Sequence, residues 1–192
     1  GGKGFVVSDE FSSEAAGFAA SFSELAYGIR DAKTPELQAA SEQFVIDTIK
    51  QSFNFTDVQV KEQVASDNQW IFASTENIST GGGDYVIDIR GTEKLADWRR
   101  NANAVSMDGN DIGISGKVHE GFGTLAQGVF NSIPESVFRG LASGNDTLTI
   151  TGHSLGGAGA TILSAMVAEK VWEINGGGAK PIGGLQAYTF GA

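Results

Sequence analysis

The sequence predicts one α/β domain in which a mostly parallel sheet is flanked by helices. Residues 147–151 form a short β-branched run, residues 155–171 an Ala-rich helical run, and residues 185–190 a further strand. This strand–helix–strand order is typical of a parallel sheet covered on both faces. The 192 residues, of which 41% are hydrophobic and 19% charged, provide material for one core of ordinary size.

Composition excludes several classes of function. A formal net charge of -10 at pH 7 repels a phosphate backbone, so we expect no nucleic-acid partner. The chain has no cysteine, which removes disulfides, thiolate nucleophiles and Cys-based metal sites. Its two histidines, His119 and His153, are too few for a His-rich metal centre, and we expect no metal and no cofactor. No run reaches the ~18 apolar residues of a membrane span, so no transmembrane segment is expected.

The first half of the chain predicts two helices followed by antiparallel strands. Residues 11–30 repeat apolar side chains at spacings of three and four, which indicates an amphipathic helix. Thr34 is a good N-cap for a second helix, with Pro35 at the first helical position. Residues 81–83 form a glycine turn between two strands. The strands are expected at residues 58–64, 70–74 and 85–89.

The second half begins with a polar, glycine-rich connection over residues 90–117. A helix is predicted at 121–141, interrupted or kinked near Pro134. Residues 108–111 resemble the start of a calcium loop, but Ile112 occupies a ligand position, so a turn is the better interpretation.

A single motif in the chain carries recognisable chemistry. Gly152 to Gly156 reads G-x-S-x-G between a β-branched strand and a helical run, which is the setting of a nucleophile elbow. A serine hydroxyl there stands exposed on a sharp turn, where larger neighbours in place of the glycines would collide. The new helix directs backbone N–H groups at an oxyanion, with the amide of Leu155 nearest. The alternative is a turn that only connects strand to helix.

The motif and its flanking residues, TGHSLGGAGATILS, resemble the nucleophile segment of the class 3 lipases, the fungal-lipase-like branch of the α/β-hydrolase fold. Three further blocks are similar in order and approximate spacing: YVIDIRGTEKLADW at 85–98, VHEGF at 118–122 and AYTFGA at 187–192. ELAYG at 24–28 is also similar to the first helix of the family, so the likeness spans nearly the whole chain.

The resemblance implies an α/β-hydrolase that cleaves carboxylic esters of lipids through an acyl-enzyme on Ser154. It also implies that the backbone N–H of Thr92 is the second oxyanion donor, beside Leu155. Leu95 and Trp98 would belong to a lid that makes transient contact with a lipid surface. A packed core position is the alternative for Trp98. The family suggests an extracellular protein, and the preference among triacylglycerol, phospholipid and feruloyl esters stays open.

The resemblance departs from the full family pattern at the triad. Hydrolases of this fold carry their residues in the order Ser, acid, His. After Ser154 the chain has two acids, Glu169 and Glu173, and no histidine. His119 matches the family's V-H-x-G-F histidine, which is not its general base, and His153 is expected on the opposite side of the turn from the nucleophile.

We therefore expect residues 1–192 to be one incomplete α/β-hydrolase domain, itself inactive. The last strands of the fold, with the catalytic acid and histidine, are expected beyond residue 192. Ending the sheet at residue 190 would expose an apolar edge. The missing histidine also motivates a second hypothesis, a non-catalytic module of this fold that binds a lipid or a protein.

Overall fold

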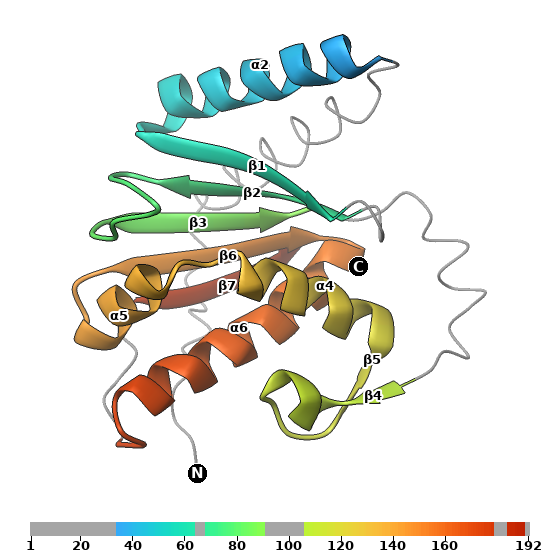
Figure 1. The fold of residues 1–192 in the computed structure, drawn as a ribbon, viewed down its shortest axis with the longest axis vertical. Helices are drawn as coiled ribbons and strands as arrows, with labels where there is room; N and C mark the ends of the chain where they lie inside the picture. The colour runs from blue at the N-terminus through green and yellow to red at the C-terminus, as the bar shows by residue number, and fades with distance from the viewer. Residues whose placement is uncertain (1–33, 64–67, 91–105, 179–183, 191–192) are drawn as a thin grey trace.

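The computed structural model describes residues 34–63, 68–90, 106–178 and 184–190. These residues form a five-stranded sheet, a two-stranded hairpin and helices on both faces of the sheet (Figure 1). The elements are α2 (Pro35–Phe53), β1 (Asp57–Gln63), β2 (Asn68–Ser74), β3 (Asp84–Ile89), β4 (Ser106–Asp108), the 3₁₀ turn η2 (Gly109–Ile112), β5 (Lys117–His119), α4 (Glu120–Asn131), α5 (Glu135–Ser143), β6 (Thr147–His153), α6 (Leu155–Ile174) and β7 (Leu185–Phe190).

The main sheet has the order β1-β2-β3-β6-β7. β2 is antiparallel to both β1 and β3, whereas β3, β6 and β7 are mutually parallel. Four of the five strands therefore run in one direction. The predicted fold class, a mostly parallel sheet that opens with antiparallel strands, is confirmed.

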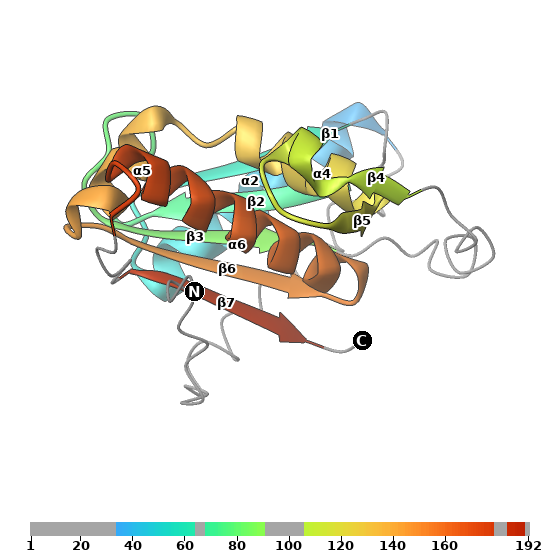
Figure 2. The same ribbon diagram turned by 90° about the horizontal axis from the view of Figure 1, so that it is seen from below.

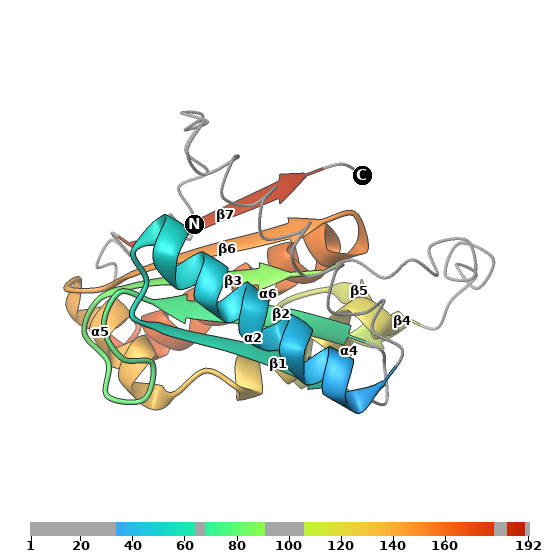
Figure 3. The ribbon, with the colours of Figure 1, turned by 90° about the horizontal axis from the view of Figure 1, so that it is seen from above.

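The sheet lies between two helical layers. Helices α4, α5 and α6 cover one face and α2 crosses the other, as views from opposite sides show (Figures 2 and 3). The larger core lies under α4–α6 and includes Phe72, Ile87, Leu125 and Ile150. A smaller core joins α2 to β1 and β2. Side chains of β3 and β6 alternate between these two faces, because successive residues of a strand point in opposite directions.

Local chemistry explains where the helices begin and end. Thr34 caps α2 by accepting a hydrogen bond from the backbone N–H of Leu37, and Pro35 starts the helix, as predicted. Pro134 separates α4 from α5, so the predicted helix over 121–141 is two helices. A proline inside one continuous helix would remove a backbone hydrogen bond and clash with the preceding turn.

The connection after residue 90 contains structure that the sequence did not predict. Strands β4 and β5 pair antiparallel, and η2 lies between them. Asp108 caps η2 by accepting from the N–H of Asn110, which confirms a turn at residues 108–111. Met107 and Val118 pack against the larger core.

Two negative findings concern only the residues described above. No helix among them is long and apolar enough to cross a membrane. Within the same ranges, no three His, Asp or Glu side chains gather as a metal site would need. The predicted helix at 11–30 lies outside the described residues.

Candidate active site

Ser154 lies at the junction between β6 and α6, in a backbone conformation that side chains rarely adopt. Its φ is 55° and its ψ is -120°. Among the described residues other than glycine, only Asn54 also has a positive φ, and asparagine at a helix C-cap is common. Such a conformation costs about 1–3 kcal/mol and persists where the surrounding structure imposes it. Ser154 is partly exposed, and its side chain does not cap α6.

The glycines of the motif are required by close backbone contacts. A Cβ on Gly152 would overlap the carbonyl oxygen of Gly156, and a Cβ on Gly156 would overlap the carbonyl oxygen of Ile89. At Gly159 an added Cβ would lie 2.8 Å from Cδ2 of Leu125 on α4. These glycines let the first turn of α6 lie directly against β3 and α4, which imposes the sharp turn at Ser154.

The N-terminus of α6 carries the backbone N–H of Leu155, which the sequence predicts as an oxyanion donor. Leu155 is the first residue of this 20-residue helix and is partly exposed. The first N–H groups of a helix have no intrahelical acceptor, and the helix dipole places partial positive charge there. The amide of Leu155 follows Ser154 directly, so it can receive negative charge that develops at the serine.

The carboxyl end of β3 lies beside this turn. β3 and β6 pair in parallel with Ile89 opposite Gly152, so Arg90 leaves β3 next to the residues that lead to Ser154. Thr92, the predicted second donor, and the predicted lid residues Leu95 and Trp98 lie outside the described residues.

A buried carboxyl group near the turn was not predicted from the sequence. Asp88 on β3 is 1% exposed and accepts a hydrogen bond of 2.5 Å from the hydroxyl of Thr151 on β6. Burial raises the pKa of Asp88 to about 7, and the hydrogen bond from Thr151 partly opposes that shift. An aspartate in an otherwise β-branched and apolar strand was the available signal, but its partner becomes evident only from the strand register.

Within the described residues, neither His119 nor His153 has a contact with Ser154 that would make it the base. His119 caps α4, where its Nδ1 accepts from the N–H of Gly121 at 3.2 Å, and its ring packs 4.8 Å from that of Phe122. This agrees with the expectation that His119 is not the general base. His153 has a buried Nδ1 with no hydrogen-bond partner in the described part of the chain. Because successive residues of a strand point to opposite faces, and Gly152 lies on the face covered by α6, His153 at the end of β6 points to the other face.

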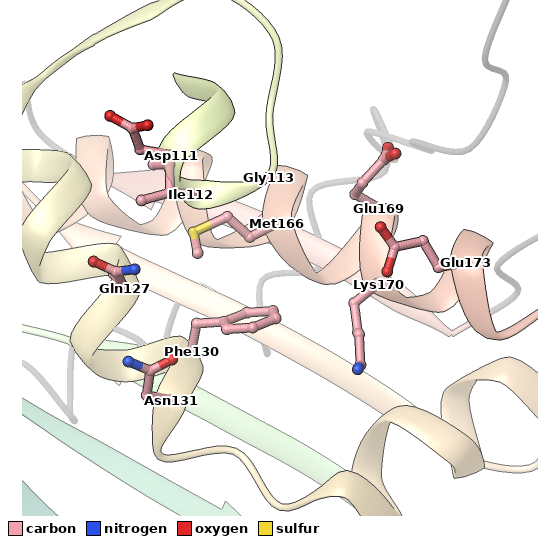
Figure 4. A pocket seen from close by; sticks show the side chains of 10 residues that line it. All are labelled: Asp111, Ile112, Gly113, Gln127, Phe130, Asn131, Met166, Glu169, Lys170 and Glu173. Atoms are coloured by element: carbon pink, nitrogen blue, oxygen red, sulfur yellow. The ribbon is translucent and has the colours of Figure 1, made fainter. Parts of the chain in front are cut away.

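An open pocket of about 330 Å³ lies elsewhere, on the face formed by η2, α4 and α6 (Figure 4). Phe130 and Met166 provide its apolar surface, and Asp111, Glu169 and Glu173 give it acidic side chains. Met166 follows Ser154 by twelve residues of α6, about 18 Å along the helix axis. The pocket therefore does not adjoin the serine.

Comparison with known proteins gives one family match. The family described as Lipase (class 3) matches residues 86–192, more than half of the chain and the part that contains Ser154. No match was found among curated protein sequences.

Two solved structures of a Rhizomucor miehei lipase resemble the chain in fold. The triacylglyceride lipase structure has a TM-score of 0.56 and 18% sequence identity, and the match covers 93% of this chain and 62% of that one. The native lipase propeptide complex has a TM-score of 0.54 and 17% identity, with 93% and 53% covered. The chain thus spans 53–62% of the length of these relatives.

Proposed function

Because the chain belongs to the class 3 lipase family, we propose that it is the nucleophile-bearing part of a serine hydrolase that cleaves carboxylic esters of lipids. The observation that carries this proposal is Ser154 itself. It is a partly exposed serine at φ 55°, between two glycines that tolerate no side chain, at the N-terminus of a long helix. A turn that only connects strand to helix requires none of this strain.

The proposed reaction starts with attack of Ser154 Oγ on the ester carbonyl carbon while a base takes the hydroxyl proton. The tetrahedral oxyanion accepts hydrogen bonds from the backbone N–H groups of Leu155 and Thr92. Collapse breaks the ester C–O bond, releases the alcohol with a proton and leaves the acyl group on Ser154. Water then hydrolyses the acyl-enzyme. The base and its supporting acid are required from outside the described residues.

The substrate class rests on the family and on the proposed lid. Triacylglycerol is the first candidate, because the structural relative with the TM-score of 0.56 is named a triacylglyceride lipase. Leu95 and Trp98 would present an apolar surface that contacts a lipid interface when the lid opens. Short-chain esters in solution would then react more slowly than emulsified ones.

The test uses the protein as the cell makes it. We expect a fluorophosphonate probe to label the wild type at Ser154 and to leave Ser154→Ala unlabelled. Emulsified triacylglycerol should be hydrolysed only by the wild type. Labelling equal to that of Ser154→Ala would refute the catalytic proposal.

A second candidate, a non-catalytic lipid-binding module, is favoured by the histidines. His119 serves as a helix cap, and His153 is on the strand before the nucleophile. This candidate predicts that the whole natural protein is not labelled but still binds a fluorescent fatty-acid ester. Binding that is equal in wild type and Ser154→Ala, without turnover by either, would establish it.

A further inference from the structure

Asp88 and Thr151 form a side-chain link between the two strands that lead into the proposed site. They are register partners on β3 and β6, and Asp88 Oδ1 accepts from Thr151 Oγ1 at 2.5 Å. Asp88 is 1% exposed and Thr151 is fully buried. The hydrogen bond is therefore shielded from water, where it is stronger than at a surface.

The position of this link in the chain relates it to the turn. Asp88 precedes Arg90 by two residues, and Thr151 precedes Ser154 by three. Within the described parts of β3 and β6, the other side-chain hydrogen bond between the strands joins Asp84 to Thr147, four residues further from the turn. Within the described residues of these strands, the Asp88–Thr151 bond is thus the side-chain link nearest to the turn at Ser154.

Burial of the Asp88 carboxyl group at this position costs free energy. Its second oxygen, Oδ2, is buried and has no hydrogen-bond partner among the described residues. An apolar side chain would fill the same place without the cost of burying a polar group. Costly polar groups of this kind concentrate at functional sites.

The neighbours of Asp88 do not neutralise it directly. Arg90, which follows the last residue of β3, donates from Nη1 to Gln69 on β2 at 3.2 Å. His153 is the diagonal neighbour on β6, two residues beyond Thr151. The remaining described neighbours on this face carry no charge: Ile71 on β2, Val86 on β3 and Thr149 on β6. The strong contact of Asp88 is therefore with the strand that carries the serine.

We propose that Asp88 and Thr151 are positioning residues of the nucleophile turn, and that their buried hydrogen bond holds Ser154 and the backbone N–H of Leu155 in place at the end of β6. This inference rests on the proposed hydrolase function. Displacing one donor by about 1 Å is expected to slow the chemical step by up to ~100-fold without weakening substrate binding. The effect should therefore fall on kcat and not on KM.

The test compares two threonines of β6 that each donate to an aspartate of β3, one in a buried pair near the turn and one in an exposed pair far from it, in the whole natural protein. Thr151→Val removes the buried bond, Thr151→Ser keeps the hydroxyl, and Thr147→Val removes the equivalent bond to Asp84 far from the turn. We expect Thr151→Val to lower kcat by about tenfold or more with KM changed by less than about twofold. Thr151→Ser should restore most of the rate, and Thr147→Val should leave kcat within about twofold of wild type.

A double variant separates positioning from stability. Asp88→Val with Thr151→Val replaces both partners by apolar groups, which is nearly neutral for folding. We expect this variant to regain thermal stability and stay slow. Recovery of kcat together with stability, or an unchanged kcat in Thr151→Val, would overturn the inference.

Hydrogen exchange provides a readout that does not depend on turnover. In Thr151→Val, amides at the end of β6 and in the first turn of α6 should exchange about tenfold faster, whereas amides of β1 and β2 should not change. If the wild type is not labelled by the fluorophosphonate, the proposed function fails. Exchange alone then decides the inference, and unchanged rates at the turn would overturn it.

Discussion

Strands β3 and β6 are joined near both ends by an aspartate that accepts a hydrogen bond from a threonine, yet the two ends differ. At the amino end the Asp84–Thr147 pair is exposed. Beside it, Asp146 uses both carboxylate oxygens, which accept from the backbone N–H groups of Gly82 and Gly83. Burial, and then the charge of Asp146, raise the pKa of Tyr85 at this end to about 12, so its hydroxyl stays protonated.

The carboxyl end carries the opposite features. Its Asp88–Thr151 pair is buried and leaves one carboxyl oxygen without a partner in the described structure. Three residues after Thr151, Ser154 adopts its strained backbone conformation. The amino end also leaves a buried polar atom, the Tyr85 hydroxyl, without a hydrogen-bond partner in the described structure. The carboxyl end differs because its buried carboxyl group lies close in sequence to the strained Ser154, which supports the site that the sequence motif indicates.

The largest expected effect is at the carboxyl end, in Gly156→Ala. The added Cβ would overlap the carbonyl oxygen of Ile89, which is backbone and cannot move aside. We expect a loss of about 3 kcal/mol or more in the free energy of unfolding, measured with urea, and no labelling of Ser154.

Gly157→Ala is the matched control for this substitution. Its Cβ would lie 3.3 Å from Cβ of Thr189, a tight but adjustable contact. Helix propensity favours alanine, so the stability should stay within about 1 kcal/mol of wild type. Equal stability losses in the two variants would contradict the close approach of α6 to β3.

At the amino end, Asp146→Ala should lower stability while sparing the site. It removes a buried carboxylate that holds two backbone amides, a loss of about 2–4 kcal/mol in the free energy of unfolding. Fluorophosphonate labelling of the folded fraction should keep its wild-type rate. Slower labelling per folded molecule would show that the two ends are not independent.

Asp88→Asn tests the difference between the two ends through the pH dependence of the free energy of unfolding. Its carboxyl keeps a proton up to about pH 7 in the folded state and loses it near pH 3.8 in the unfolded state. The contribution of Asp88 to the free energy of unfolding therefore falls as pH rises from 3.8 to 7, and its whole penalty applies above pH 7. Asparagine keeps an acceptor for Thr151 and does not titrate.

The difference in free energy of unfolding between Asp88→Asn and wild type should thus shift in favour of the variant by about 1–3 kcal/mol from pH 5 to pH 8. Urea unfolding at both pH values measures this shift. Asp84→Asn, at the exposed pair, is the control and should show a difference near zero. A gain for Asp84→Asn equal to that for Asp88→Asn would contradict the burial argument.

The smallest expected effect on stability is in Ser154→Gly. Glycine adopts a positive φ without strain, so we expect a gain of about 1 kcal/mol in stability together with complete loss of labelling. Ser154→Ala keeps the Cβ and should lose labelling without that gain. Thermal unfolding of the two variants side by side tests the strain, and equal melting temperatures would argue against it.

Strong local signals explain which parts of this structure could be predicted. Thr34 and Pro35 indicate the start of α2, Pro134 the break between α4 and α5, and the glycines around Ser154 the sharp turn, because each acts on its immediate neighbours. The hairpin of β4 and β5 was missed because three-residue strands are too short for an alternating pattern to appear.

The Asp88–Thr151 pair was missed for a different reason. The two residues are 63 positions apart, and only the register of β3 on β6 brings them together. The same register pairs Ile89 with Gly152, so the end of β3 lies beside the residues that lead to Ser154, which local periodicity could not indicate. Long-range pairing of this kind depends on the assembled sheet.

The most direct test of the account is a crystal structure of the whole natural protein after reaction with a fluorophosphonate. The account predicts a phosphorus–oxygen bond to Ser154 Oγ, with the phosphoryl oxygen about 2.7–3.1 Å from the backbone nitrogens of Leu155 and Thr92. A phosphonate bound to another residue, or a phosphoryl oxygen directed to solvent away from both amides, would contradict it.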